Sequence, residues 1–160
     1  MAGNAHHYRL RTVWTGAGAH GTRDYGEYGR DFRAEVGGKP ALLGSADPAF
    51  RGDAMRHNPE DWMLAAVASC HMLSYLALCA RRRLQVLAYE DESEATLVLT
   101  PDGGGAFDGF TLRPVVTIAQ DADAALASRL HEQAHALCFI ARSCAVPIDV
   151  QPVIRHVGAD

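Results

Sequence analysis

Cysteines carry the most reactive side chains of this chain of 160 residues, which has 4 of them. Cys70 lies near the middle of an uncharged stretch, and Cys138 follows His135 by three residues in a second helical pattern. The thiolate of a cysteine is a nucleophile, so two thiols that meet when helices pack can support redox chemistry. A buried cysteine is otherwise a small apolar residue, the plain interpretation for Cys79 and Cys144. Cys70 and Cys138 are not a CxxC pair, so spacing alone leaves both interpretations open.

A second reactive set, His131-Glu132-Gln133-Ala134-His135, has the HExxH pattern of zinc peptidases. On a helix its two histidines share one face and can bind zinc, with the glutamate as general base. The chain has 8 histidines, so such a short pattern can arise by chance, and no third-ligand pattern such as HxxGxxH follows. Two interpretations remain: a zinc hydrolase using His131 and His135, or a polar stripe on an amphipathic helix.

The segment Gly16-x-Gly18-x-x-Gly21 formally matches the glycine pattern of dinucleotide-binding proteins. That pattern requires a helix to follow it. The residues that follow, TRDYGEYG, form helices poorly. We therefore expect no nucleotide site.

The element that would position Cys70 is a helix predicted from Asn58 to Arg83. Asn58 can cap it, and Pro59 suits the first helical position. Acidic residues follow at the positive end of the helix dipole, and three arginines stand at its negative end.

No charged residue occurs between Trp62 and Ala80, which invites a membrane-spanning interpretation. The run contains Ser69, His71 and Ser74, is rich in alanine, and lies between segments typical of amphipathic strands. A helix that is apolar on every side is expected to be buried on every side. The pattern thus favours a central helix wrapped by sheet, or one sharing a core with a second subunit.

The remaining segments predict strands around this helix and a second helix near the end. The second helix is expected from Asp121 or Asp123 to about Ser143, with Pro147 after it. Without repeats or linkers, we expect one α+β domain over residues 1–160. The predicted strands are 8–14, 31–36, 40–43, 85–90, 94–100, 110–118 and 148–153.

The composition is that of an ordinary globular protein, with 48% hydrophobic and 21% charged residues. A net charge of -4 gives no electrostatic argument for binding nucleic acid. The first residues, MAGNAHHYRLRTVW, lack the apolar core of a signal peptide, so a cytoplasmic protein is expected. In that setting cysteines are more often thiols, redox centres or ligands than structural disulfides.

Several segments resemble motifs of the OsmC/Ohr superfamily, the organic hydroperoxide reductases. Asn58-Pro59-Glu60-Asp61, with Cys70-His71-Met72 further along, resembles that family's NPEEL…AC helix. Residues 134–143, AHALCFIARS, resemble its AHxxCFIANS segment. Residues 45–53, SADPAFRGD, and residues 89–91, YED, are similar to a subgroup nearer OsmC than Ohr. The resemblance covers most of the chain and has both cysteine motifs in the same order.

The resemblance implies an α+β, OsmC-like fold, with antiparallel sheets around a long buried central helix in an intertwined homodimer. It also implies a role for each matching residue. Cys70 corresponds to the peroxidatic cysteine, Cys138 to the resolving cysteine, and Glu60 to the glutamate of NPEE. The family's catalytic arginine comes from a variable loop, for which Arg51 is our choice and Arg56 the substitute.

The function implied is that of a thiol-dependent peroxidase that reduces organic hydroperoxides, and hydrogen peroxide more weakly. Cys70 would become a sulfenic acid, Cys138 would condense with it to a disulfide, and a dithiol, which in this family can be lipoyl-linked, would reduce it. An apolar helix disfavours a thiolate, so the arginine would have to supply positive charge. Glu60 lies roughly 15 Å from Cys70 along one helix, so it would act in a composite site across a two-fold axis.

Neither a cofactor nor a metal is expected, and neither nucleic acid nor a membrane is an expected partner. The apolar residues Trp62, Met63, Met72 and Phe139 favour organic hydroperoxides. Arg142 stands where the family motif has Asn, so the hydrogen bonding near Cys138 is expected to differ from that of the family. Cys144 is additional to the family motif and could compete as a resolving thiol. The alternatives are a non-catalytic or ligand-binding protein of the same fold and, less favoured, the zinc hydrolase.

Overall fold

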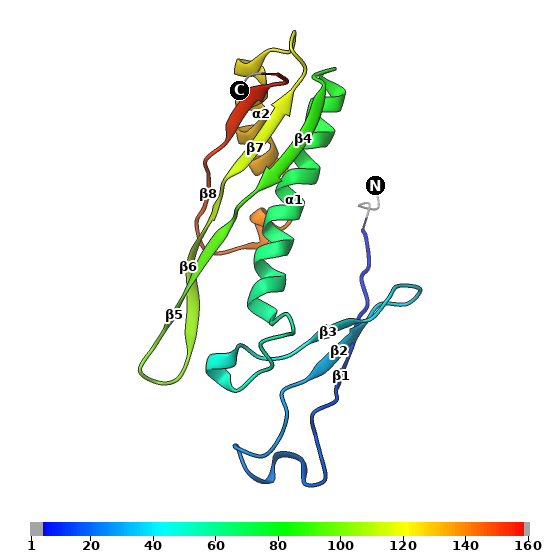
Figure 1. The fold of residues 1–160 in the computed structure, drawn as a ribbon, viewed down its shortest axis with the longest axis vertical. Helices are drawn as coiled ribbons and strands as arrows, with labels where there is room; N and C mark the ends of the chain where they lie inside the picture. Colours follow the sequence, from blue (N-terminus) through cyan, green and yellow to red (C-terminus); the bar gives the residue numbers. More distant parts are fainter. Residues whose placement is uncertain (1–4, 159–160) are drawn as a thin grey trace. The chain divides into compact units, whose positions relative to one another are not determined.

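The computed structural model describes residues 5–158 (Figure 1). The chain divides into two compact units, Met1–Trp62 and Met63–Asp160, each described by itself. The helix α1, Pro59–Arg81, begins in the first unit and continues in the second.

The first unit contains a three-stranded antiparallel sheet in the order β1-β2-β3. Its strands are β1 (Arg11–Trp14), β2 (Phe32–Glu35) and β3 (Leu42–Gly44), so the predicted hairpin is confirmed. After β1 comes only a 3-10 turn, η1 (Gly21–Arg23). The glycine pattern therefore lacks the helix that a dinucleotide site needs, as expected.

The start of α1 has the cap predicted from the sequence. The Asp61 N–H donates to Oδ1 of Asn58 at 2.8 Å, and the Asn58 N–H donates to Oδ2 of Asp61 at 3.2 Å. These reciprocal bonds satisfy donors that the first helical turn leaves free. The helix ends at Arg81, and Arg83 adopts the left-handed conformation with φ 56°.

Burial of α1 within this chain is confined to one stripe. The buried residues Val67, His71, Tyr75 and Cys79 recur every fourth position, which places them on one helix face. The helix is long and apolar enough to cross a membrane by length and composition, and 28% of its most apolar window is buried. Within one copy of the chain only one face of α1 is buried, so the expected burial on every side is not reached there.

The second unit contains two three-stranded sheets (Figure 1). In each sheet, one strand pair is antiparallel and the other is parallel, so the sheets are mixed, not purely antiparallel. The predicted strand 110–118 divides before Pro114, and the predicted last strand divides around Pro152, since proline cannot donate to a ladder. The first sheet has β4 (Val86–Asp91), β7 (Pro114–Ile118) and β9 (Val153–His156), and the second has β5 (Glu94–Leu99), β6 (Gly105–Leu112) and β8 (Ile148–Val150).

The second helix, α2 (Ala124–Leu137), is shorter than predicted. Asp123 caps it, because its side chain accepts the Leu126 N–H at 2.9 Å. It ends because Cys138 has an extended backbone, with ψ 114°. The chain then makes a separate 3-10 turn, η3 (Ala141–Ser143), so the predicted continuation to Ser143 is wrong.

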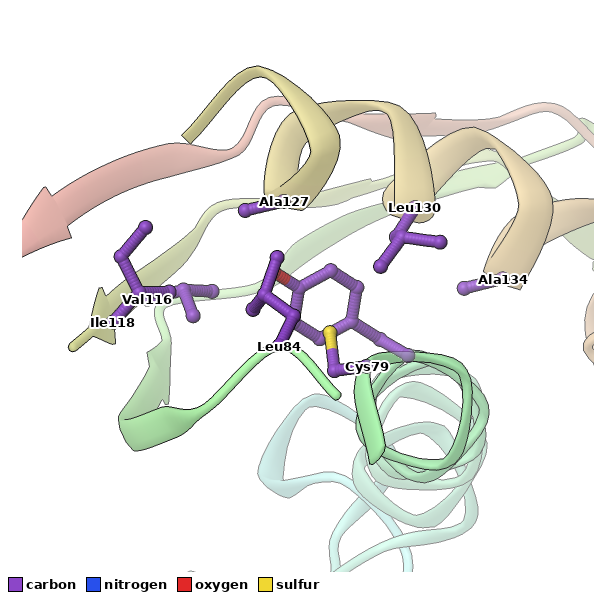
Figure 2. Packing of buried hydrophobic residues seen from close by; sticks show 8 residues of the cluster. Cys79, Leu84, Val116, Ile118, Ala127, Leu130 and Ala134 are labelled. Atoms are coloured by element: carbon purple, nitrogen blue, oxygen red, sulfur yellow. The ribbon is translucent and has the colours of Figure 1, made fainter. Parts of the chain in front are cut away.

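The main core of the second unit lies between α1, α2 and the β4-β7-β9 sheet (Figure 2). Tyr75 is the largest fully buried side chain in it, and Ala127 and Ala134 of α2 are fully buried there. A smaller cluster forms around Val67, Phe110 and Leu112. The α+β class and the order of elements are confirmed. The main cluster consists of Tyr75, Cys79, Leu84, Val116, Ile118, Ala127, Leu130 and Ala134.

Candidate functional site

The structure brings together the two cysteines that the sequence singled out. Cys70 lies half-buried on α1, and Cys138 is fully buried at the residue that caps the C-terminal end of α2. The Cys70 side chain lies beside the Cys138 thiol, close enough to perturb it. Packing of α1 against α2 therefore places two thiols, distant in sequence, in one site.

The electrostatics around Cys138 favour its protonated form. Burial, and then the neighbouring Cys70 side chain, raise the pKa of the Cys138 thiol to about 11, although the Ala141 N–H donates to its sulfur at 3.4 Å. A thiol with so high a pKa is a weak nucleophile toward free peroxide at pH 7, because the thiolate is the reactive form. Cys138 is therefore poorly suited to make the first attack on a peroxide.

Cys70 opens onto an apolar groove of about 650 Å³. Leu73, Leu137 and Phe139 are 62%, 50% and 80% exposed, so a large apolar surface surrounds the thiol. Phe139 was predicted to line the site, whereas Trp62 packs edge-to-face on Phe32 in the first unit. The groove is lined by Ala66, Ser69, Cys70, Leu73, Ser74, Ala77, Leu78, Arg81, Leu137, Phe139 and Ile140.

Two histidines on the helices that carry the cysteines, His71 on α1 and His131 on α2, form a buried pair that the sequence interpretation missed. Nε2 of His71 and Nδ1 of His131 lie 3.0 Å apart, and the rings are 1% and 2% exposed. The ring of Tyr75 stacks on that of His131 at 3.8 Å. The signal in the sequence was the spacing of His71 and Tyr75, which puts two polar side chains on one face of an apolar helix.

This pair changes the interpretation of the HExxH pattern. His131 is not part of an exposed polar stripe, because it is buried against His71 and Tyr75 of α1. Nor do His131 and His135 gain a third ligand: among residues 5–158, no group of three or more His, Cys, Asp or Glu side chains could hold a metal ion. Within the described residues, His131 of this pattern takes part in helix packing.

The loop that carries Arg51 belongs to the first unit and is tightly built. Asp47 accepts the Ala49 N–H with its side chain and the Gly52 N–H with its carbonyl. Arg51 adopts the left-handed conformation with φ 68°, and a Cβ on Gly52 would lie 1.6 Å from the Ala46 oxygen. A side chain at position 52 would clash with the loop backbone, so glycine is required there.

Arg51 and Arg56 differ in their partners within the first unit. The Arg51 guanidinium donates to the Gly26 carbonyl at 3.3 Å and lies 6.0 Å from the centre of the Tyr25 ring. Arg56 lies 3.4 Å from carboxylates of both Asp31 and Asp53. Within the described residues, Arg51 has no carboxylate partner, so its charge is the less compensated of the two.

Glu60 is half-buried in the first turn of α1.

Comparison with known proteins gives a family match. The model of the OsmC-like protein family matches residues 52–152. An uncharacterized protein of Bacillus subtilis (strain 168), YmaD, is 30% identical over 97 residues, which are 59% of this chain and 64% of that protein. The matched part thus spans less than two thirds of that relative.

Solved structures match over nearly the whole chain. An OsmC-like protein of unknown function from Vibrio cholerae has a TM-score of 0.80 at 24% identity, covering 93% of this chain and 100% of that chain. An organic hydroperoxide resistance protein OsmC from Legionella pneumophila has a TM-score of 0.68 at 18% identity, covering 93% and 96%. The organic hydroperoxide resistance protein OhrB of Bacillus subtilis has a TM-score of 0.61 at 20% identity, covering 94% and 98%. At these identities the matches establish the fold.

Proposed function

Because this chain belongs to the OsmC-like family, we propose that it is a thiol-dependent peroxidase that reduces organic hydroperoxides. The observation that carries the proposal is the meeting of Cys70 and Cys138 beside an apolar groove. The structural neighbours from Legionella pneumophila and Bacillus subtilis described above are named as organic hydroperoxide resistance proteins, which supports the same activity.

The proposed reaction divides into two steps at the cysteines. The Cys70 thiolate attacks the distal oxygen of the hydroperoxide, the O–O bond breaks, and the alkoxide leaves and takes up a proton to give the alcohol. Cys70 is then a sulfenic acid. The Cys138 thiol condenses with it, the sulfenic S–O bond breaks, and the products are the disulfide and water.

A dithiol reductant completes the cycle. Its thiolate attacks the Cys70–Cys138 disulfide, and its second thiol resolves the mixed disulfide. Two protein thiols and one oxidised reductant result. A lipoyl-type dithiol is the reductant we propose, and the reaction requires no metal or cofactor.

The groove supports a preference for organic hydroperoxides over hydrogen peroxide. Leu73, Leu137 and Phe139 present apolar surface next to Cys70. Burying the alkyl part of a substrate there would add about 25 cal/mol for each Å² removed from water, and hydrogen peroxide has no such part.

Arg51 is the cation that we propose for activating Cys70, with Glu60 orienting it. Arg51 is favoured over Arg56 by its lack of a carboxylate partner in the described part of the chain. Glu60 comes ten residues before Cys70 on α1, roughly 15 Å away along the helix. We therefore propose that Glu60 and Arg51 act in a site completed by a second subunit.

A homodimer is the proposed assembly, and the exposed side of α1 supports it. Only 28% of its most apolar window is buried within one chain, and the groove beside it exposes large apolar side chains. Apolar patches of this kind usually mark an interface. A second copy covering α1 would bury that surface without a membrane.

We further propose a single OsmC-like domain over residues 1–160, acting in the cytoplasm.

Purified protein should consume cumene hydroperoxide with dihydrolipoamide as the reductant, and do so faster than it consumes hydrogen peroxide. Zinc analysis of the same sample tests the rival hydrolase. No consumption of either peroxide with any dithiol, despite free Cys70 and Cys138, would overturn the proposal and favour a ligand-binding member of the fold.

A further inference from the structure

The hydrogen bond between His71 and His131 joins the two helices that carry the cysteines. His71 directly follows Cys70 on α1, and His131 lies about two helical turns before Cys138 on α2. Movement of α2 along or around α1 would shift the Cys138 sulfur relative to Cys70. The pair is therefore placed where it can control how the two sulfurs meet.

The surrounding packing gives this hydrogen bond a task that apolar contacts perform poorly. At this face of α2 the small side chains of Ala127 and Ala134 lie on either side of Leu130, and apolar contacts such as these have no preferred direction. A hydrogen bond weakens steeply when its length or angle changes. Stacking of Tyr75 on His131 at 15° between ring planes fixes the orientation of that imidazole.

The pair occupies space that a fully apolar contact could fill more simply. Nδ1 of His71 and Nε2 of His131 are buried and have no hydrogen-bond partner among residues 5–158. Such groups cost stability relative to well-packed apolar side chains. Polar contacts that lower stability in this way can serve to fix the register in which two helices pack.

The pair is unsuited to the alternative task of supplying charge or taking protons. Burial lowers the pKa of His71 to about 4 and that of His131 to about 3, so both rings are neutral at pH 7. A neutral imidazole with so low a pKa is a poor base for a thiol. Geometry is what the pair can contribute.

We propose that the His71–His131 hydrogen bond is a positioning contact that holds the Cys70 and Cys138 sulfurs where a disulfide can form. The inference rests on the proposed function for its place in catalysis. Its physical content, the closeness of the two sulfurs, can be measured without any peroxide.

Crossed amide substitutions test the contact. The amide of Asn lies as many bonds from Cα as Nδ1 of histidine, and the amide of Gln lies as many bonds as Nε2. H131N and H71Q therefore keep a hydrogen-bonding group at the position used in the pair. H131Q and H71N have the same chemistry with the amide misplaced.

The readout is the effective concentration of the Cys70–Cys138 pair, from equilibration with glutathione at a temperature where each variant is folded. Protein dithiol and oxidised glutathione exchange to protein disulfide and two reduced glutathiones, and peptide mass mapping quantifies this disulfide apart from Cys79 and Cys144. We expect the effective concentration in H131N and H71Q to lie within about threefold of the wild-type value. In H131Q and H71N it should be at least about tenfold lower, which corresponds to a rise of about 30 mV in the reduction potential of the disulfide.

The crossed order distinguishes positioning from bulk, because a role in filling space would rank Asn and Gln alike at both positions. The inference would be overturned if the same amide, Asn or Gln, gave the higher effective concentration at both positions. It would also be overturned if all four variants had the effective concentration of the wild type. If wild-type protein consumes no peroxide while the crossed order appears, the proposed function fails and the positioning contact stands.

Discussion

Nε2 of His71 lies 3.0 Å from Nδ1 of His131, inside the contact between α1 and α2. Burial is the largest cause that lowers the pKa of each ring, to about 4 for His71 and about 3 for His131. The neighbouring His135 lowers the pKa of His71 further, whereas Asp91 on β4 raises it. The pair is neutral in the folded protein at pH values where the unfolded chain already binds protons.

This difference predicts that acid destabilises the protein through the pair. Unfolded histidines have a pKa of about 6.5, so the free energy of unfolding should fall as the pH falls from about 6.5 toward 4, by about 2 kcal/mol per histidine at pH 5. Urea unfolding at pH 7.5 and pH 5 measures it. The H71Q/H131N double variant, which cannot titrate there, should lose correspondingly less. Equal losses in wild type and the variant would contradict the pKa shifts.

Arg51 and Arg56 should differ in their effect on activity. R51M should lower peroxidase turnover about a hundredfold, since it would remove the cation proposed beside Cys70. R56M should change turnover less than about threefold and stability by at most about 1 kcal/mol, because it breaks two partly exposed ion pairs with Asp31 and Asp53. Steady-state rates with cumene hydroperoxide measure both, and the reverse order would exclude Arg51.

The order of helices and strands along the chain could be predicted from the sequence, because signals between neighbouring residues determine it. The Asn58 cap, the uncharged run of α1 and the β2–β3 hairpin are each encoded within a few neighbouring residues. The prolines at positions 114 and 152 divide two predicted strands, and their effect is also local, although the prediction overlooked it.

Contacts between distant segments could not be predicted from periodicity. The meeting of Cys70 with Cys138 was expected only through the family resemblance, and the residue roles remain predictions. His71 and His131 are 60 positions apart, so only the packing of α1 on α2 reveals them as a pair. The HExxH pattern was misleading for the same reason, since it describes one helix and not what that helix packs against.

Cys138 should be needed for resolution and not for the first oxidation. In C138S, one equivalent of cumene hydroperoxide should still oxidise Cys70, and dimedone should trap the sulfenic acid. Steady-state turnover should fall at least about tenfold, because the disulfide that the dithiol reduces no longer forms. C144S is the matched control and should keep wild-type turnover. Loss of turnover in C144S, with C138S unaffected, would make Cys144 the resolving thiol.

The exposed side of α1 should hold the proposed dimer together. L73E places a charge in the apolar groove and should shift the protein from dimer to monomer in analytical ultracentrifugation, since an unpaired charge is costly to bury. L87E is the control, because Leu87 on β4 is 49% exposed and lies outside the groove. A wild-type protein that is monomeric at micromolar concentration would contradict the assembly.

The most direct measurement is the rate of cumene hydroperoxide consumption by wild-type protein and by C70S, each with dihydrolipoamide. The proposed mechanism predicts turnover by wild type and a fall of at least about a thousandfold in C70S, equivalent to about 4 kcal/mol of transition-state stabilisation, because the nucleophile is gone. C79S, which alters a buried thiol outside the groove, should remain active. Full activity in C70S would contradict the assignment of Cys70 as the thiol that attacks peroxide.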